Sequence, residues 1–153
     1  MKTLDTLVLE APLFTDLDPA FAELLAGCAT TAGAGRGELI FREGDPADTF
    51  WLIRHGRVGL ELYSPSGGGL AIETLVAGDV LGWSWLFPPY RWHFDARALD
   101  DVRAVAVDGA CLRGKCEADP AFGYELMRRF SAVMLDRLQA TRLRLLDVYG
   151  TAT

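Results

Sequence analysis

Apolar and polar positions along the chain form three successive patterns. After a turn signal at Asp18 and Pro19, apolar side chains recur at helical spacing, which predicts a short helix over about 19–28. From Gly33 onward, short β-rich runs are separated by glycine-containing turns, and the runs cover roughly 38–42, 49–54, 57–63, 70–76 and 80–82. Short strands separated by regular turns indicate a β-sandwich or barrel.

Two further strands are expected within HFDARALDDVRAVAVD (93–108), around a turn at Asp100 and Asp101. Earlier in the chain, the run SPSGGG (64–69) is flanked by VGLEL and LAIETL, which can pair with each other across it. We therefore interpret SPSGGG as the tip of a hairpin rather than as a linker. The barrel is expected over about 30–108, within one domain that takes up all 153 residues.

The last third of the chain has a helical pattern. DGACLRGKC (108–116) predicts a short helix, and Asp119–Pro120 opens a long one, over about 119–148. One stripe of the long helix can pack on the barrel and consists of Phe122, Leu126, Phe130 and Val133. A second stripe alternates spacings of four and three, which is typical of a heptad seam, and consists of Met127, Ser131, Met134, Leu138, Thr141, Leu145 and Val148.

The second stripe needs a partner, because a helix of about 30 residues is about 45 Å long and a small barrel cannot cover it. A second copy of the same helix is the simplest partner. The alternative is a helix packed wholly on its own domain. The sequence therefore predicts a homodimer whose interface includes Met127, Met134, Leu138, Thr141 and Leu145.

Composition narrows the classes of function. A net charge of −6 argues against nonspecific nucleic-acid binding, which needs a basic face. The two histidines, His55 and His93, are far apart and have no acid at metal-ligand spacing, so no metal site is expected. No nucleophile–base pair or carboxylate pair stands at a useful spacing. We therefore expect no catalytic residues and no enzyme.

Cysteine content and hydropathy bear on location. Cys28, Cys111 and Cys116 match no zinc or redox motif and are expected as free or buried thiols in a reducing cytosol. The N-terminal MKTLDTLVLEAPLF (1–14) contains acids where a signal peptide needs an apolar region, and no apolar run approaches about 20 residues. These features predict a cytoplasmic protein without a membrane segment.

Four stretches carry a family resemblance. They are PLFTDLD (12–18), GELIFREGDPADTFWLIRHGRVGLEL (37–62), LVAGDVLGWSWLF (75–87) and RALDDVRAVAVD (97–108). Their order and spacing resemble the cyclic nucleotide-binding domain, in the form of the sensor half of Crp/Fnr transcription regulators, over about residues 10–148. The resemblance implies a double-stranded β-helix, or jelly-roll barrel, with a short N-terminal helix and a long C-terminal dimerisation helix.

The resemblance also locates a phosphate-binding cassette, which in the family reads approximately G-E-L-A-L, then about six residues, then R-[ST]-A. There the Glu accepts a hydrogen bond from the ribose 2′-hydroxyl, and the Arg pairs with the cyclic phosphate. In this sequence Gly82 matches the cassette glycine, but Trp83 stands at the Glu position. Counting back from DARA (95–98) places Trp92 at the Arg position and His93 at the Ser/Thr position. Tryptophan therefore replaces both charged determinants.

Neighbouring groups are the available substitutes. Arg91, one residue from the expected Arg, either contacts an anion or stays exposed, and His93 either donates to an anion or is structural. The tryptophans either line a pocket or fill it. Polar residues of the long helix stand near where family members contact the base. The candidate ligand-binding residues are Gly82, Trp83, Ser84, Trp85, Arg91, Trp92, His93, Arg137 and Thr141.

Two functions remain open for such a chain. The first is a regulatory sensor domain that binds a small effector, either a cyclic nucleotide held in an altered way or an unknown molecule, and signals through a dimer. The alternative is a ligand-free dimeric scaffold for a partner protein, with Trp83 and Trp92 filling the former nucleotide pocket. Family regulators continue into a helix-turn-helix domain, whereas this sequence ends at Thr153 after the helix. We therefore expect no direct DNA binding.

Overall fold

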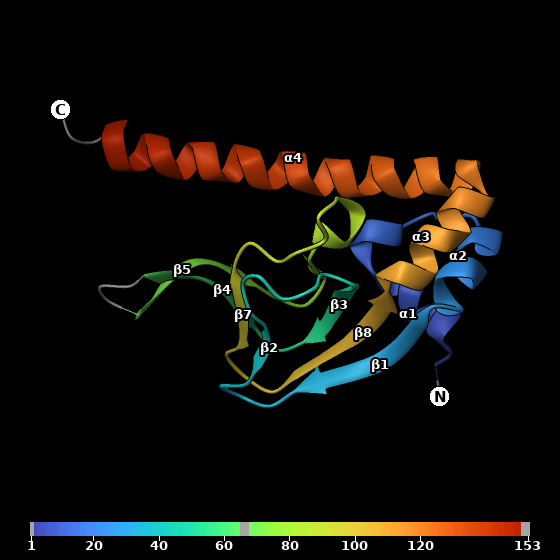
Figure 1. Ribbon diagram of the computed structural model, residues 1–153, viewed down its shortest axis with the longest axis horizontal. Helices are drawn as coiled ribbons and strands as arrows, with labels where there is room; N and C mark the ends of the chain where they lie inside the picture. Colours follow the sequence, from blue (N-terminus) through green and yellow to red (C-terminus); the bar gives the residue numbers. More distant parts are fainter. Residues whose placement is uncertain (1, 65–67, 151–153) are drawn as a thin grey trace.

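The computed structural model describes the backbone of residues 2–64 and 68–150 and the side chains of residues 2–63 and 70–147. Two four-stranded sheets lie beneath the long helix α4 (Pro120–Gly150), which crosses the top of the view in Figure 1. The N-terminal helices and α3 (Gly109–Ala118) gather at one end, below the first turns of α4. This architecture confirms the expected jelly-roll barrel with a long C-terminal helix.

The two sheets are antiparallel throughout the described residues. The first has the order β1-β8-β3-β6 and consists of β1 (Ala29–Ala34), β8 (Val102–Asp108), β3 (Thr49–His55) and β6 (Val80–Leu81). The second has the order β2-β7-β4-β5 and consists of β2 (Leu39–Phe41), β7 (Asp95–Ala98), β4 (Val58–Ser64) and β5 (Gly68–Leu75). β4 and β5 pair as the expected hairpin, with Leu62 opposite Leu70, and residues 65–67 of its tip lie outside the described part of the chain.

Most helices begin at a side chain that can cap them. Asp18 accepts a hydrogen bond from the Ala20 amide at 2.9 Å, which starts α2 (Pro19–Ala26) close to its expected position. Asp108 accepts from the Cys111 amide at 3.0 Å and starts α3. Two elements were not expected from the sequence, α1 (Leu4–Glu10) and strand β1, whereas the 3₁₀ turn η1 (Pro12–Phe14) lies within the stretch PLFTDLD that resembles the family's N-terminal helical lead-in. Within the residues described, no helix combines the length and the apolar character of a membrane span.

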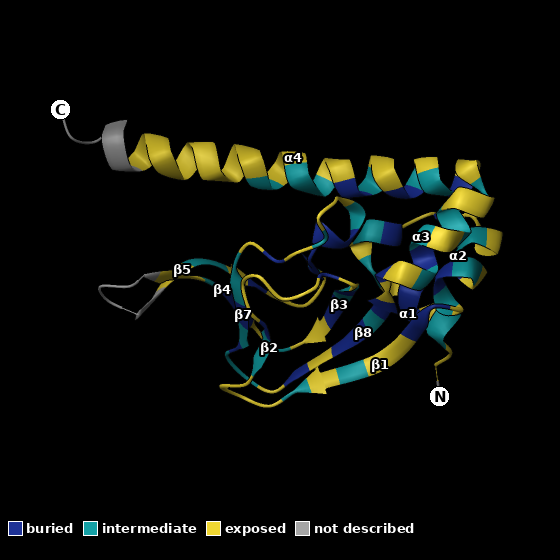
Figure 2. Ribbon diagram, viewed as in Figure 1, coloured by how far each residue is buried: buried dark blue, intermediate teal, exposed yellow. Residues whose placement is uncertain are grey.

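The buried apolar side chains form two clusters. The helical cluster lies between the helices and the first sheet and includes Phe50, Trp85 and Phe130. The barrel cluster draws on both sheets and includes Phe41 and Trp92. Figure 2 shows that α4 contributes a buried face only along its first half. The segment between β6 and β7 supplies one buried tryptophan to each cluster, Trp85 to the helical cluster and Trp92 to the barrel cluster.

The expectation of free thiols is wrong for two of the three cysteines. Cys28 and Cys111 form a disulfide across 83 residues of sequence, and Cys116 is the free cysteine. The reason lies in the pairing of β1 with β8, which places Ala29 opposite Val107. The residue before β1 and the helix after β8 are therefore neighbours, which cysteine spacing alone does not show.

Candidate functional site

The segment from Gly82 to Phe94, called the cassette below, connects β6 to β7 and passes through the 3₁₀ turn η2 (Ser84–Leu86). Gly82 has a φ of 96°, a conformation that favours glycine. A Cβ at Gly82 would come within 2.5 Å of the Trp92 ring, so the close approach also requires glycine. The cassette then contains a cis peptide bond between Pro88 and Pro89. The cassette glycine is thus fixed by its backbone and by Trp92.

Trp92 lies inside the barrel. Its side chain is 3% exposed, and its ring stacks on Phe41 with centroids 3.9 Å apart and planes 9° apart. Backbone bonds hold this position: the Gly44 amide donates to the Trp92 carbonyl at 2.8 Å, and the Trp92 amide donates to the Asp45 carbonyl at 3.1 Å. The residue at the expected phosphate-binding position is therefore part of the barrel cluster.

The cavity between the two sheets, beside Trp51, is small. A cavity of about 30 Å³ lies between the sheets and is lined by Trp51, Ile53 and Leu81 together with residues of β1, β2, β4 and β8. Pockets that hold small molecules typically measure about 300–1,000 Å³. A space of this size accommodates a water molecule and no nucleotide.

Trp83 and Arg137 meet above the barrel. The Arg137 guanidinium lies 4.7 Å from the centre of the Trp83 ring and donates a hydrogen bond to the Val80 carbonyl. Its Nε stands 4.0 Å from the Glu73 carboxylate. Burial lowers the pKa of the Arg137 guanidinium, while Glu73 and Asp79 act in the opposite direction. The structure thus brings together two of the residues that the sequence selected, and uses Arg137 to dock α4 on the cassette.

Arg91 and His93 lie on the outside of the barrel. Both side chains are exposed, and Arg91 donates to the Gly44 carbonyl at 3.3 Å. They flank the inward-pointing Trp92, as alternate side chains of an extended segment do. The structure therefore does not bring these two residues to the Trp83 and Arg137 contact.

The other selected residues have structural surroundings. Trp85 is fully buried in the helical cluster against Phe50 and Phe130, and its Nε1 has no hydrogen-bond partner among the described residues. Ser84 is buried beside it in η2. Thr141 is exposed, and its hydroxyl donates to the Arg137 carbonyl one turn earlier in α4. These three do not form a common surface with Trp92.

Arg113 was missed by sequence reasoning. Its guanidinium lies 4.1 Å from the centre of the Tyr90 ring and donates to the Trp85 carbonyl, which fixes the cassette against α3. Nothing in the sequence pattern singles out an arginine in a short helix outside the cassette. The contact depends on a tertiary approach of α3.

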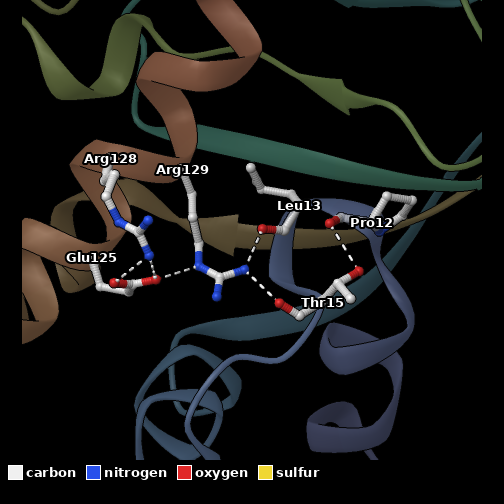
Figure 3. Close-up of polar contacts among 6 residues, drawn as sticks. All are labelled: Pro12, Leu13, Thr15, Glu125, Arg128 and Arg129. Atoms are coloured by element: carbon white, nitrogen blue, oxygen red, sulfur yellow. Dashed lines mark hydrogen bonds and ion pairs between the residues drawn. The ribbon is translucent and has the colours of Figure 1, made fainter.

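Arginines attach α4 to the rest of the chain at three points, one of which is the Arg137 contact described above. Figure 3 shows Arg129 donating to the Leu13 and Thr15 carbonyls, each at 2.9 Å, while its Nε pairs with Glu125. Arg137 reaches the Val80 carbonyl, and Arg144 donates to the Ile72 carbonyl at 3.0 Å. Arg129, Arg137 and Arg144 are eight and seven residues apart, or about two turns each, so they share one face of the helix.

The predicted seam lies on a different face of α4. At 100° per residue, Leu138 and Leu145 project well away from the arginine face. Leu138 is 49% exposed, Leu145 is 52% exposed and Met127 is 40% exposed, whereas Met134 is half-buried at the edge of the helical cluster. The seam is therefore free on the surface of the chain along most of its described length.

A groove of about 550 Å³ separates α4 from the barrel. Its floor and walls come from η1, from the turn between β5 and β6, and from the middle of α4. It contains both apolar and charged groups, and its lining includes Pro12, Leu13, Glu73, Asp79, Arg129, Asp136 and Arg137. The groove contains no residue of the cassette.

The sequence profile of the cyclic nucleotide-binding domain family matches residues 34–119. The chain belongs to this family. It is 26% identical over 148 residues to the CRP-like cAMP-activated global transcriptional regulator of Mycobacterium tuberculosis, covering 97% of this chain and 64% of that protein. The chain thus spans slightly less than two thirds of the length of this curated relative.

Solved structures agree with the family assignment. A candidate cyclic nucleotide-binding protein from Geobacter metallireducens GS-15 has a TM-score of 0.79 and 30% identity, covering 90% of this chain and 99% of that one. A cyclic nucleotide-binding domain from Methylobacillus flagellatus KT has a TM-score of 0.78 and 21% identity, covering 94% and 81%. The second likeness concerns the fold alone. The family match and the first of these structures identify the chain as a domain of the cyclic nucleotide-binding type.

Proposed function

We propose that this protein is a dimeric regulatory module whose barrel does not accept a cyclic nucleotide. The observation that carries the proposal is the position of Trp92, which stacks on Phe41 inside the barrel at the site of the expected phosphate-binding arginine. Of the two functions left open by the sequence, this geometry favours the filled pocket over an effector bound at the cassette. The signal would then travel through contacts between proteins.

Charge supports the same proposal. A buried phosphate costs several kcal/mol unless a cation or several donors pair with it. Arg91 is exposed and bonded to Gly44, while Arg137 is already bonded to the Val80 carbonyl and stacked on Trp83. Neither guanidinium faces the interior that Trp92 occupies. A cyclic phosphate placed there would therefore lack a partner.

The output surface is the seam of α4. Its leucines are exposed along the second half of the helix, and the arginine face holds the same helix against the barrel. A second α4 packed on this seam would bury the leucines in a heptad arrangement. We propose that the dimer formed in this way presents the surface that a partner protein recognises.

Thermal unfolding with cyclic AMP and cyclic GMP tests the filled barrel. A ligand present at about a hundred times its Kd stabilises the folded state by about 2.7 kcal/mol and raises the melting temperature by several degrees. We expect no shift at about 1 mM of either nucleotide. A saturable shift that Arg91→Ala abolishes, without a change in the unliganded melting temperature, would reject the proposal.

A second candidate function is supported by the groove along α4. Its volume of about 550 Å³ suits a small effector, and it borders both Arg129 and Arg137, which position the helix. An effector there could change the docking of α4 without entering the barrel. A small molecule released on denaturation, or a thermal shift lost in Ala140→Trp but kept in the seam variant Leu145→Ala, would favour this function over a ligand-free module.

A further inference from the structure

The disulfide stands where three helical segments meet. Cys28 lies between α2 and β1, and Cys111 lies in the first turn of α3. α3 leads through Asp119 directly into α4, and the two helices are in close contact: a Cβ at Gly123 would lie 3.2 Å from the Cys116 Cβ. The disulfide therefore connects the N-terminal helices to the helix on which the base of α4 rests.

The N-terminal segment is also bound to α4 itself. Arg129 donates to the carbonyls of Leu13 and Thr15, as Figure 3 shows. The segment before β1 is thus attached to α3 through the disulfide and to α4 through Arg129. Helix α2 connects the two attachment points, so we expect a change in the first attachment to alter how firmly the second holds.

Both cysteines of the disulfide border the surface of the chain. Cys28 is buried, whereas Cys111 is half-buried, and both line a surface hollow of about 480 Å³. The same hollow is lined by Asp48, Thr49 and Asp108. Because Cys111 is the more exposed residue of the pair, we expect an external thiol that enters the hollow to attack the Cys111 sulfur.

Other contacts keep α3 in place when the disulfide is open. Lys115 Nζ donates to the Leu24 carbonyl at 2.8 Å, and the Asp108 amide donates to the Cys28 carbonyl at 2.8 Å. Leu112 is fully buried in the helical cluster. Opening the disulfide therefore loosens the junction and leaves the fold intact, which is the requirement for a reversible switch.

We propose that Cys28 and Cys111 form a reversible redox site that a dithiol reductant opens, and that the closed disulfide tightens the base of α4 and strengthens the dimer. The last clause rests on the proposed function, whereas the redox site itself does not. The regulated quantity is the affinity of one chain for another.

The reaction is a thiol–disulfide exchange with a dithiol. The thiolate of the reductant attacks the Cys111 sulfur, the bond between the two protein sulfurs breaks, and Cys28 leaves as a thiolate that takes up a proton. The second thiol of the reductant then attacks the reductant sulfur that is bonded to Cys111. This bond breaks, and Cys111 is released as a thiolate that takes up a proton. Two electrons and two protons pass to the protein, and the reductant becomes a disulfide.

Cys116 supplies the matched control. Burial raises the pKa of its thiol, and Asp119 and Glu117 act in the same direction, which disfavours the thiolate form that attacks disulfides. It lies on the same helix as Cys111 and outside the disulfide. Cys116→Ser should therefore leave the redox response unchanged.

The first experiment treats native protein with dithiothreitol, removes the reductant, and only then denatures the protein and counts its thiols by their reaction with a polyethylene glycol maleimide. We expect one modified cysteine in the oxidised wild type and three after native protein is treated with dithiothreitol, with a return to one after oxidation by a disulfide form of the reductant. The melting temperature should fall by about 10 °C on reduction. Three thiols under oxidising conditions, or reduction that requires a denaturant, would overturn the proposal.

The second experiment separates the redox site from the dimer. In sedimentation, reduced wild type and the double variant Cys28→Ser/Cys111→Ser should dimerise at least about fivefold more weakly than oxidised wild type and Cys116→Ser. In the variant Leu138→Glu, designed to be monomeric, amide exchange at 13–15 and in the first turns of α4 should accelerate at least about fivefold on reduction. Faster amide exchange on reduction, with an unchanged dimerisation affinity, would reject only the claim that the disulfide regulates the dimer. Unchanged amide exchange would reject the claim that the disulfide tightens the base of α4.

Discussion

The first half of α4 buries its apolar side chains, and the second half exposes them. Phe122, Leu126 and Phe130 are fully buried in the helical cluster. Beyond Met134, the large apolar side chains of the described residues lie on the surface, and these are Leu135, Leu138, Leu143, Leu145 and Leu146. Figure 2 shows the change along the helix. One continuous helix thus has a half that belongs to the core and a half that does not.

The attachment to the barrel also differs between the halves. The first half packs through aromatic rings, and the second half is held by guanidinium groups that donate to backbone carbonyls of Val80 and Ile72. Apolar packing of this kind contributes several kcal/mol per side chain, and a hydrogen bond to a charged group about 1.5–3 kcal/mol. Detaching the second half from the barrel should therefore cost less free energy than unpacking the first half.

The largest effect is expected from Phe130→Ala. Phe130 is fully buried, and its ring contacts Phe50 and Trp85 edge-on at 5.1 and 5.4 Å between centroids. Removing the ring leaves a cavity, and we expect a loss of about 3–5 kcal/mol in the free energy of unfolding, measured with urea. Leu135→Ala in the second half is the matched control and should change stability by less than about 0.5 kcal/mol. Similar losses in both variants would abolish the distinction between the halves.

The second prediction concerns the seam. Leu138→Glu places a charge where the second helix of the dimer would pack, and we expect dimerisation to weaken at least about a hundredfold in sedimentation. Leu143→Glu is the control, because it lies about 140° around the helix from Leu138 and is 63% exposed. A dimer that resists Leu138→Glu, or dissociates equally with Leu143→Glu, would place the interface elsewhere.

The same comparison explains what the sequence could predict. Strand runs, capping at Asp18 and the long helix are local patterns, and the structure confirms them. The β1 strand was missed because its residues 29–34 are mostly small and carry little alternation. The two faces of α4 follow from helical spacing, which is why the buried stripe was predicted with the correct residues. The dimer itself stays a prediction.

The sequence singles out Trp83 and Trp92 but does not predict which way their side chains point. Comparison with the family pattern places both at positions where that pattern has charged residues, and this assignment stays a prediction. The direction in which Trp92 points depends on backbone hydrogen bonds to Gly44 and Asp45, which lie far from Trp92 in the sequence. The disulfide and the Arg113 contact with Tyr90 likewise arise from tertiary approach, which no spacing rule contains.

The third prediction addresses the polar attachment of the second half. Arg137→Ala removes the bond to the Val80 carbonyl and the contact with the Trp83 ring, so we expect a loss of about 2 kcal/mol in the docking of the helix. Measured in the Leu138→Glu background, amide exchange should accelerate beyond residue 134 and stay unchanged over 122–130. Arg142→Ala, an exposed charge-matched control, should have no such effect. Faster exchange along the whole helix would mean that the halves are one unit.

The smallest effect is expected from the ion pairs at the base of the helix. Hydrogen bonds from Arg128 and Arg129 hold the pKa of the Glu125 carboxyl below its ordinary value. A carboxyl whose pKa is lower when folded stabilises the fold above its unfolded pKa of about 4.3, and this contribution is lost as the pH falls through the folded pKa. Because these ion pairs lie at the surface of the helix, where solvent screens them, the change is small. The melting temperature of wild type should fall slightly more steeply from pH 6 to pH 3 than that of Glu125→Gln.

Asp100→Asn, which removes an ion pair with Arg57 on the barrel, serves as the comparison. This variant should flatten the same pH profile without changing amide exchange in α4, whereas Glu125→Gln should accelerate amide exchange in the first half of α4. Equal exchange in the two variants would show that packing alone holds the base of the helix.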